Sequence, residues 1–499
     1  MTKQEALDTL YEKIFAIRSL NMANALIHWD ASTSGVPEKS LPARGAAMGW
    51  ISGEGFRRFI APDTLECIET LEGMADDLDS NERVMVSEYG QKYRKFMAIP
   101  PKEFQEFSAL TAQAEPIWEK ARENNDFDMM LPYYEKIFDY QRRLCDWYGY
   151  EKNPYDALLD DYEKGANVEK LDGFFNALRE KLSPLLKDII KAGKQPQEIT
   201  GLFDIAKQRE LMPWLADFVG YDRSRGKVGE VEHPFCTTIN RHDVRITTKY
   251  HGDNLLSALY STVHESGHAV YEQNMDENLA IYGLDECASM GMHESQSRLY
   301  ENIVGRSRAF TGLLLPKLKD LFDYFSDWDE EMLYKAANVA RPSLIRIEAD
   351  ELTYSLHIMV RYELEKGLIN GEIKVADLPE LWADKYEELL GVRPGNHAEG
   401  VLQDVHWSGG AVGYFPSYAI GTAYGAQMVS TMKKSMDIDA VISSGDLSPI
   451  TGWLKENIHL KGLTLSPDEI LKLATGESFN PNYYIDYLVE KFTGIYCRT

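Results

Sequence analysis

The sequence predicts a mainly α-helical protein, built as one large domain with a single small β-hairpin. Apolar residues recur every three or four positions over most of the 499 residues, which is the helical period. β-branched residues gather in one stretch instead. No internal repeat or low-complexity linker divides the chain, which favours one continuous body, although length alone would permit two to four domains.

The first half of the chain is predicted to be helical until the hairpin. Apolar positions at helical spacing, with charges between them, indicate helices at residues 3–27, 68–97, 102–123, 128–149 and 167–192. The hairpin is predicted at residues 231–250, where Asn240-Arg241-His242-Asp243 forms the turn between two β-branched runs. A purely structural sheet and a functional one are both compatible with this pattern.

Helices resume near Asn254 in the second half. Further helical segments are predicted at residues 290–302, 343–366, 376–391, 466–475 and 482–492, with Ser343 after Pro342 as a helix cap. Residues 400–427 are rich in glycine and aromatic residues and are too irregular for a long helix. We expect loops there, and loops on a rigid scaffold often carry function.

Charge and cysteine content exclude several classes of protein. The net charge of −26 would repel phosphate backbones and anionic lipids, so neither nucleic acid nor a membrane is an expected partner. The five cysteines are odd in number and include no C-x-x-C pair, which argues against a disulfide framework. The start of the chain reads as an amphipathic helix, not a signal peptide, and no run of 18 apolar residues occurs. We expect a cytoplasmic protein.

The pentad His264-Glu265-Ser266-Gly267-His268 predicts a metal site. On a helix, His264 and His268 lie one turn apart on the same face, with Cβ atoms roughly 6 Å apart, so both imidazoles can bind one Zn²⁺. Glu265 is then placed to serve as a general base. A glycine inside this helix would let another segment approach closely. The alternative is two solvated histidines beside a surface glutamate.

A third ligand is the necessary check, since catalytic zinc takes three protein ligands and keeps one open position. Glu294, 26 residues after His268, is the favoured candidate, and the adjacent His293 is its competitor. Adjacent helical residues point about 100° apart, so only one of these two can face the metal.

Comparable zinc sites often carry, four residues after the third ligand, a carboxylate that orients a histidine. Here that position is Arg298, so the orienting group must come from elsewhere in the chain. Asp350 and Asp404 are the candidates.

Six motifs in order make the chain similar to a known family. They are His233-Pro234-Phe235, Asp243-Val244-Arg245-Ile246-Thr247, the pentad, His293-Glu294-Ser295-Gln296-Ser297, Ile345-Arg346-Ile347-Glu348-Ala349-Asp350 and Gly400-Val401-Leu402-Gln403-Asp404-Val405-His406-Trp407. With these motifs the sequence resembles the carboxypeptidase Taq family of metallocarboxypeptidases (peptidase family M32).

This resemblance implies a single helical zincin-like domain over residues 1–499, with a deep cleft and a small sheet beside the catalytic helix. A helical lid would occupy about residues 1–100 and the catalytic core about residues 200–430. The implied activity is release of C-terminal residues from peptides with broad side-chain tolerance. The implied metal is Zn²⁺, with Co²⁺ as a substitute, and the implied assembly is a homodimer.

Within this framework, His264, His268 and Glu294 would hold the metal, and Glu265 would be the general base. His406 and Tyr418 are candidates for the hydrogen-bond donor to the developing oxyanion. The alternatives are a structural histidine packed on Trp407 and a core tyrosine.

The substrate's free carboxylate calls for a bidentate arginine, and Arg346 is the best candidate. It would share a helical stripe with Asp350 and His357, and a plain Arg346–Asp350 helix pair is the alternative. Arg245, on the hairpin, would hold either the sheet or the substrate backbone, and the hairpin's free edge could pair with the peptide. His233 would line the cleft.

Two rival functions remain at this point. One is a zinc oligoendopeptidase that cuts internal bonds of short peptides. The other is a metal-free helical binding protein with a coincidental pentad.

Overall fold

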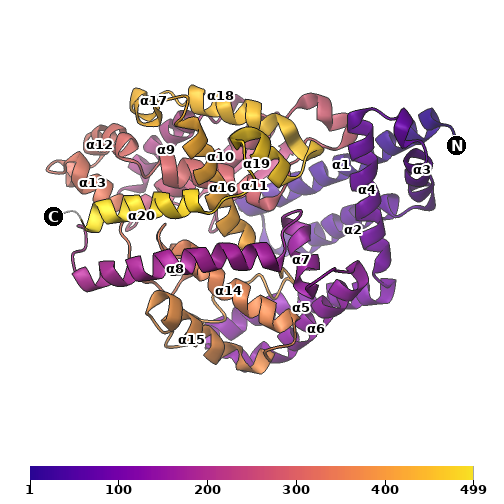
Figure 1. The fold of residues 1–499 in the computed structure, drawn as a ribbon, viewed down its shortest axis with the longest axis horizontal. Coiled ribbons are helices and arrows are strands. Elements are labelled where there is room, and N and C mark those ends of the chain that lie inside the picture. The colour runs from indigo at the N-terminus through magenta and orange to yellow at the C-terminus, as the bar shows by residue number, and fades with distance from the viewer. Residues whose placement is uncertain (498–499) are drawn as a thin grey trace.

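Helices follow one another along almost the whole chain (Figure 1), in a computed structural model that describes residues 1–497. The mainly helical class is therefore confirmed. The α-helices are α1 (Lys3–Thr33), α2 (Leu41–Phe59), α3 (Pro62–Glu72), α4 (Ser80–Ala98), α5 (Pro101–Asn124), α6 (Leu131–Tyr148), α7 (Pro154–Tyr162), α8 (Val168–Ala192), α9 (Ile205–Val219), α10 (Leu255–Gln273), α11 (Met290–Arg298), α12 (Arg308–Leu321), α13 (Glu330–Ala337), α14 (Tyr354–Ile369), α15 (Leu378–Leu390), α16 (Pro416–Met432), α17 (Ile438–Ser444), α18 (Ser448–Asn457), α19 (Pro467–Thr475) and α20 (Asn482–Tyr496).

A small sheet precedes the helix that carries the pentad. Its strands are β1 (Val228–Glu230), β2 (Cys236–Asn240) and β3 (Asp243–Thr248), in the order β1-β3-β2. The predicted hairpin is confirmed as β2 and β3, which pair antiparallel with Cys236 opposite Ile246. The short strand β1 was not predicted and runs parallel to β3. The central strand β3 packs on α10, where the hydroxyls of Thr248 and Thr262 lie 3.2 Å apart.

Two predicted helices are wrong in part, for different reasons. The segment 343–366 becomes helical only at Tyr354, where α14 begins, and carries just a short 3₁₀ turn at Arg346–Glu348 before that. The Asp350 side chain accepts the backbone N–H groups of Leu352 and Thr353, which favours a turn over a continuous helix. The segment 68–97 is split into α3 and α4, because Asp79 starts a new helix with a capping box.

The prediction that residues 400–427 contain no long helix is wrong in its second half. Residues 400–415 are irregular, but α16 runs from Pro416 to Met432 and starts with a proline in its first turn. Gly421 and Gly425 lie inside this helix and allow it to pack closely against α11; they do not form loops. A Cβ on Gly421 would lie 2.7 Å from the Cβ of Glu294 on α11.

Helix α11 lies between α10 and α16, and glycines allow both close approaches. On the α10 side, a Cβ on Gly267 would lie 2.8 Å from the Cα of Ser297, which explains the small residue inside the pentad. On the α16 side, Gly421 and Gly425 face α11. These crossings bring residues far apart in the sequence to one place.

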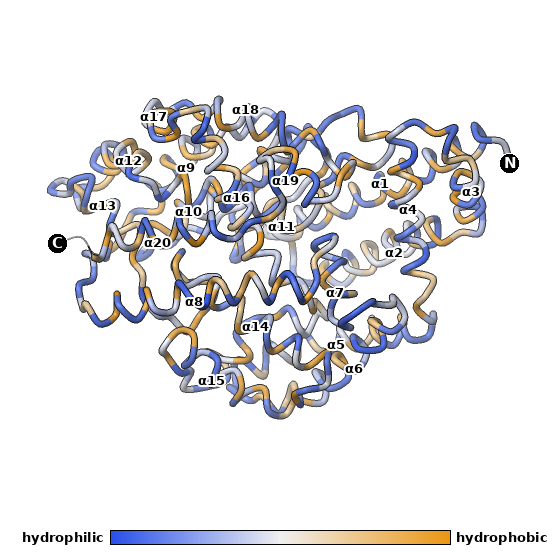
Figure 2. Tube along the Cα trace, in the orientation of Figure 1, coloured by the Kyte–Doolittle hydropathy of each residue, from blue (hydrophilic) through white to orange (hydrophobic). Residues whose placement is uncertain are grey.

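Hydrophobic and hydrophilic residues alternate along outer helices such as α8 and α15, as expected for helices with one buried face (Figure 2). Helices α1–α4 gather at one end of the molecule, and α20 lies alongside α8 toward the other (Figure 1). A separate hydrophobic cluster joins the N-terminal helices to the connection between α10 and α11; it consists of Ala6, Leu7, Leu10, Ile14, Cys67, Leu71, Leu78, Met85, Val86, Leu279 and Leu284. Among residues 1–497, no helix combines the length and apolar character needed to cross a bilayer.

Candidate active site

Helix α10 presents the two histidines of the pentad on one face. The helix starts cleanly because the Asn254 side chain accepts the backbone N–H of Ser257. The rings of His264 and His268 lie edge to face, with centroids 4.9 Å apart. The one-turn spacing read from the sequence is thus realised in the fold.

Helix α11 brings Glu294 to the same point. Its Oε2 atom lies 3.8 Å from Nε2 of His264 and 3.5 Å from Nε2 of His268. One donor atom from each of the three residues lies within 4.8 Å of the others. The competitor His293 is engaged elsewhere, since its Nε2 lies 3.1 Å from a Glu272 carboxylate oxygen and its ring stacks on His268.

These donors fit a zinc-type metal, which favours two imidazole nitrogens and a carboxylate oxygen. Nδ1 of His264 lies 2.9 Å from Oε2 of Glu301. A proton on Nδ1 leaves the Nε2 lone pair free for a metal. Nδ1 of His268 is buried and has no hydrogen-bond partner among the described residues, and its ring stacks on that of His293 with centroids 4.1 Å apart.

Glu301 is the functional residue that sequence reasoning missed. The candidates Asp350 and Asp404 are wrong: Asp350 caps backbone N–H groups before α14, and Asp404 pairs with Arg346. Glu301 lies two turns after Glu294 in a π-helical segment, Leu299–Val304, that continues α11. Its position on the same side of the helix as Glu294 was the available signal.

Two arginines balance the carboxylates of this cluster. Arg298 donates to Oε1 of Glu294 at 2.6 Å and to Oε2 of Glu301 at 3.2 Å, and Arg306 donates to Oε1 of Glu301 at 3.2 Å. Burial opposes ionisation here. Arg298 and the histidines nevertheless hold the pKa of Glu294 well below its usual range, and Arg298 with His264 does the same for Glu301.

Glu265 lies beside the three donors in a cleft of about 570 Å³. Only 7% of its surface is exposed, and this burial raises its pKa to about 7. A pKa near neutrality suits a group that must take up and return a proton. The cleft is lined by Glu232, His233, Pro234, Lys249, His251, Asn254, Leu256, Ser257, Tyr260, Ser261, His264, Glu265, Glu294, Arg298, Glu301, Arg306, Arg346, Ile347, Glu348, Ala349, Tyr354 and Tyr418.

Besides Glu265, three of the predicted substrate or catalytic side chains line this cleft: His233, Arg346 and Tyr418. The predicted helical stripe of Arg346 is wrong, because no helix spans these residues. Arg346 pairs instead with Asp404, whose Oδ1 accepts from Nη2 at 2.8 Å. Its guanidinium lies over the rings of Phe415 and Tyr418.

Two other predicted side chains, Arg245 and His406, do not line the cleft. Arg245 forms a bidentate ion pair with Asp243 and lies over the ring of Trp29, so it connects the hairpin to α1. His406 packs against the Phe415 ring, with centroids 4.7 Å apart. Their predicted contacts with substrate stay predictions.

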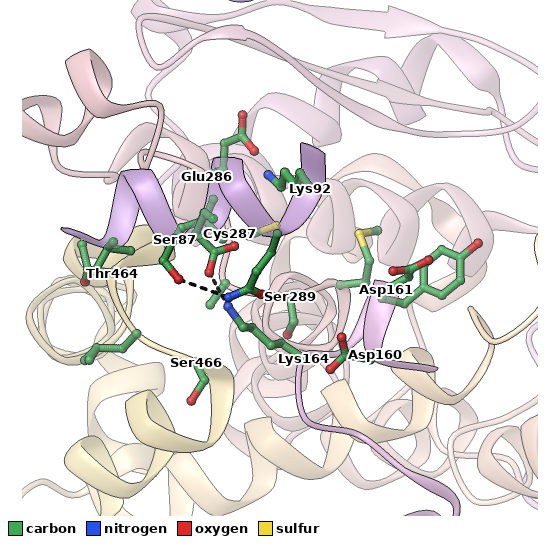
Figure 3. Close-up of a pocket in the computed structure, with 18 of the residues that line it drawn as sticks. Ser87, Lys92, Asp160, Asp161, Lys164, Glu286, Cys287, Ser289, Thr464 and Ser466 are labelled. Carbon is green, nitrogen blue, oxygen red and sulfur yellow. Dashed lines mark hydrogen bonds and ion pairs between the residues drawn. The ribbon is translucent and has the colours of Figure 1, made fainter. Parts of the chain in front are cut away.

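A second cavity, of about 440 Å³, lies between α4, α7 and the segment that leads into α11 (Figure 3). Lys164 projects into it and pairs with Glu88, while Lys95 pairs with Asp160 and Asp161. It contains none of the predicted site residues. The titratable groups that converge with metal-ligand geometry are those of the first cleft.

Comparisons with known proteins identify a family of metallopeptidases. The profile of the family described as carboxypeptidase Taq (M32) metallopeptidase matches residues 9–492. Carboxypeptidase 1 of Bacillus subtilis is 41% identical over 495 residues, which cover 97% of this chain and 99% of the relative. Thermostable carboxypeptidase 1 of Pyrococcus furiosus is 37% identical over 98% of this chain and 99% of its own length.

Solved structures show the same architecture. A structure of Pyrococcus furiosus carboxypeptidase superposes with a TM-score of 0.95 at 36% identity, covering 98% of this chain and 99% of that one. Metallocarboxypeptidase 1 of Trypanosoma cruzi gives a TM-score of 0.94 at 34% identity, with the same coverage. The chain therefore belongs to the carboxypeptidase Taq (M32) family of metallopeptidases, and it is a carboxypeptidase and a hydrolase.

Proposed function

We propose that this carboxypeptidase is zinc-dependent, with His264, His268 and Glu294 as the metal ligands and Glu265 as the general base. The observation that carries the proposal is the convergence of three donor atoms within 4.8 Å beside a buried carboxyl. A bound metal would supply a Lewis acid that polarises the scissile carbonyl and acidifies an attacking water. Zn²⁺ is the ion that this donor set suits best, and Co²⁺ is a chemically similar substitute.

The protein's own groups would then move the protons. Glu265 takes the proton of the attacking water and returns it to the leaving amine. Tyr418, which lines the same cleft, donates a hydrogen bond to the developing oxyanion. Burial raises the pKa of Tyr418 well above its usual value, which keeps the donated proton on its hydroxyl.

Arg346 would hold the substrate's terminal carboxylate. Its side chain is fixed by Asp404 and by the hydroxyl of Tyr354, to which Nη1 donates at 3.1 Å. A fixed guanidinium loses little freedom when it binds a carboxylate. His233 would line the cleft for the peptide backbone, and contacts with the backbone would leave side-chain specificity broad.

A matched pair of peptides tests the proposal. One carries a free C-terminal carboxylate and the other the same sequence with a C-terminal amide, and products are followed by mass spectrometry. We expect stepwise loss of C-terminal residues from the free acid and little cleavage of the amide. Internal cuts in both peptides at equal rates would instead support the rival zinc oligoendopeptidase.

Metal analysis separates the enzyme from a metal-free binding protein. Chelated protein should lose activity, and one equivalent of Zn²⁺ per chain should restore it. A chain that binds no Zn²⁺ and stays inactive would overturn the proposed metal site.

The remaining proposals concern the whole protein. We propose a homodimer, a cytoplasmic location and a lid formed by about residues 1–100, with the catalytic core at about residues 200–430. The five free cysteines support a reducing compartment. The hydrophobic cluster shared by α1, α3 and α4 supports a lid in which these helices pack as one unit, and Leu279 and Leu284 attach that unit to the connection between α10 and α11. Sedimentation of the purified chain tests the dimer.

A further inference from the structure

Arg298 contacts both carboxylates that surround the histidines. It lies on α11 four residues after Glu294, where its Nε donates to Oε1 of Glu294 at 2.6 Å. Its Nη1 donates to Oε2 of Glu301 at 3.2 Å. The guanidinium also lies over the ring of Tyr354, 4.3 Å from its centroid, and its side chain is only 15% exposed. Contacts with Glu294, Glu301 and Tyr354 therefore hold the guanidinium in place.

The consequence for Glu294 is that its two oxygens are no longer equivalent. Oε1 is occupied by Arg298, while Oε2 faces Nε2 of both histidines. The Ser297 hydroxyl is 3.4 Å from Oε2, but its closer partner is the Glu294 carbonyl at 2.8 Å. A carboxylate held in this way can offer a cation one oxygen, whereas a free one could turn and offer two.

We propose that Arg298 is a positioning residue that makes Glu294 a one-oxygen metal ligand. This inference rests on the proposed metal site and deepens it. A catalytic metal needs an open position for the reacting group, and a second oxygen from Glu294 would compete for that position. Arg298 thus occupies the sequence position where comparable sites carry a carboxylate. The carboxylate that orients His264 comes instead from Glu301.

The planar fork of arginine is essential to this role. A lysine at the same place would keep the charge but could not direct separate N–H groups at Glu294 and Glu301. Arg298→Lys therefore removes the directed N–H groups but keeps the positive charge, and Arg298→Met removes both. Arg306→Met is the matched control, because Arg306 donates to Glu301 and to the Ala337 carbonyl but not to Glu294.

The experiment titrates chelated protein with Co²⁺ and records the visible absorption spectrum and the affinity. Co²⁺ absorbs more strongly with four ligands than with five or six. We expect Arg298→Lys and Arg298→Met to lose band intensity while binding Co²⁺ at least as tightly as wild type. Arg306→Met should keep the wild-type intensity. With Zn²⁺, kcat should fall about 10- to 100-fold in both Arg298 variants, with KM little changed.

The possible failures are distinguishable. An unchanged Co²⁺ spectrum in Arg298→Met overturns the role of Arg298 and leaves the metal site standing. Loss of Co²⁺ affinity in step with a lower Tm would show that Arg298 only stabilises the fold, which also overturns it. If the wild-type chain binds no Co²⁺ and no Zn²⁺, the proposed metal site itself fails.

Discussion

Single residues decide whether the two histidines of α10 can bind a metal. A same-face pair of imidazoles is not enough, since each ring can rotate and each has two tautomers. Glu301 sets the orientation and tautomer of His264 through Nδ1 at 2.9 Å, and stacking on His293 restricts rotation of the His268 ring. The donors are thereby preorganised by neighbouring side chains, at a cost in buried charge that Arg298 and Arg306 offset.

Replacing Glu301 by alanine should weaken Zn²⁺ binding by about 10- to 100-fold, because His264 loses the partner that sets its tautomer and orientation. Competition with a chromophoric chelator measures the affinity. Glu348→Ala is the matched control, since Glu348 lines the same cleft without contacting a ligand residue. Wild-type affinity in Glu301→Ala would contradict the assignment.

Glu265→Gln should leave Zn²⁺ content near one per chain and lower kcat by about 10²–10⁴. Glutamine has almost the same shape as glutamate but cannot accept the proton of the attacking water. KM should change little, because the cleft keeps its lining. Activity close to wild type in the variant would mean that another group is the base.

At the scale of elements, close helix crossings assemble the site. Gly267 is the point of contact between α10 and α11, where an added Cβ would meet the Cα of Ser297 at 2.8 Å and the carbonyl oxygen of Gln296 at 2.9 Å. Both neighbours are backbone atoms, which cannot rotate away. The crossing therefore fixes how far Glu294 stands from the histidines.

Gly267→Ala should destabilise the protein by about 1–3 kcal/mol through overpacking, although alanine favours helix. Zn²⁺ affinity should fall as well, because α11 is displaced. Gly173→Ala is the control: Gly173 is exposed inside α8 with nothing within 4 Å of an added Cβ, and the change should stabilise by up to about 1 kcal/mol. The midpoint of thermal unfolding measures the stability of both variants. Equal shifts in the two would contradict the claim that Gly267 is needed for the close packing of α10 against α11.

The elements also show what could be predicted from the sequence. Local periodicity predicted α8 at residues 167–192, against the observed Val168–Ala192. It failed before α14, where the Asp350 side chain binds backbone N–H groups and Arg346 pairs with Asp404, 58 residues away. It also failed at α16, whose glycines looked like loop residues but serve long-range contacts.

The site residues also divide into those that could be predicted from the sequence and those that depend on the tertiary fold. The donors of the pentad and Glu294 could be predicted because helical spacing and short motifs place them. Glu301 was missed: its position two turns after Glu294 was a signal, but it is one of many glutamates, and the π-helical segment after α11 sets where its side chain points. The pairing of Arg346 with Asp404 likewise depends on the tertiary fold.

At the scale of the whole molecule, three helices meet at one buried carboxyl outside the cleft. Glu163, at the end of α7, accepts the backbone N–H of Gly291 on α11 at 3.0 Å and the hydroxyl of Tyr424 on α16 at 2.9 Å. The same α11 carries Glu294 and the same α16 carries Tyr418. Burial nevertheless dominates and raises the pKa of Glu163 from 4.5 to about 7.

This raised pKa makes global stability depend on pH in a defined direction. Below about pH 4.5 Glu163 is protonated in both the folded and unfolded chain, and its full contribution is present. As pH rises toward 7 the unfolded chain releases the proton while the folded chain retains it. The folded state then loses stability, by roughly 3 kcal/mol in all at about 1.4 kcal/mol per pH unit. Above pH 7 the loss is constant.

Glu163→Gln removes this titration while keeping the shape of the side chain. The Tm of the variant relative to wild type should therefore rise between pH 5 and pH 8, with chelator present throughout so that metal binding does not contribute. Glu180→Gln, on the exposed side of α8, should give a difference from wild type that does not change with pH. A flat difference for Glu163→Gln over the same range would mean that the carboxyl is ionised in the folded chain at pH 5, and that Gly291 and Tyr424 outweigh its burial.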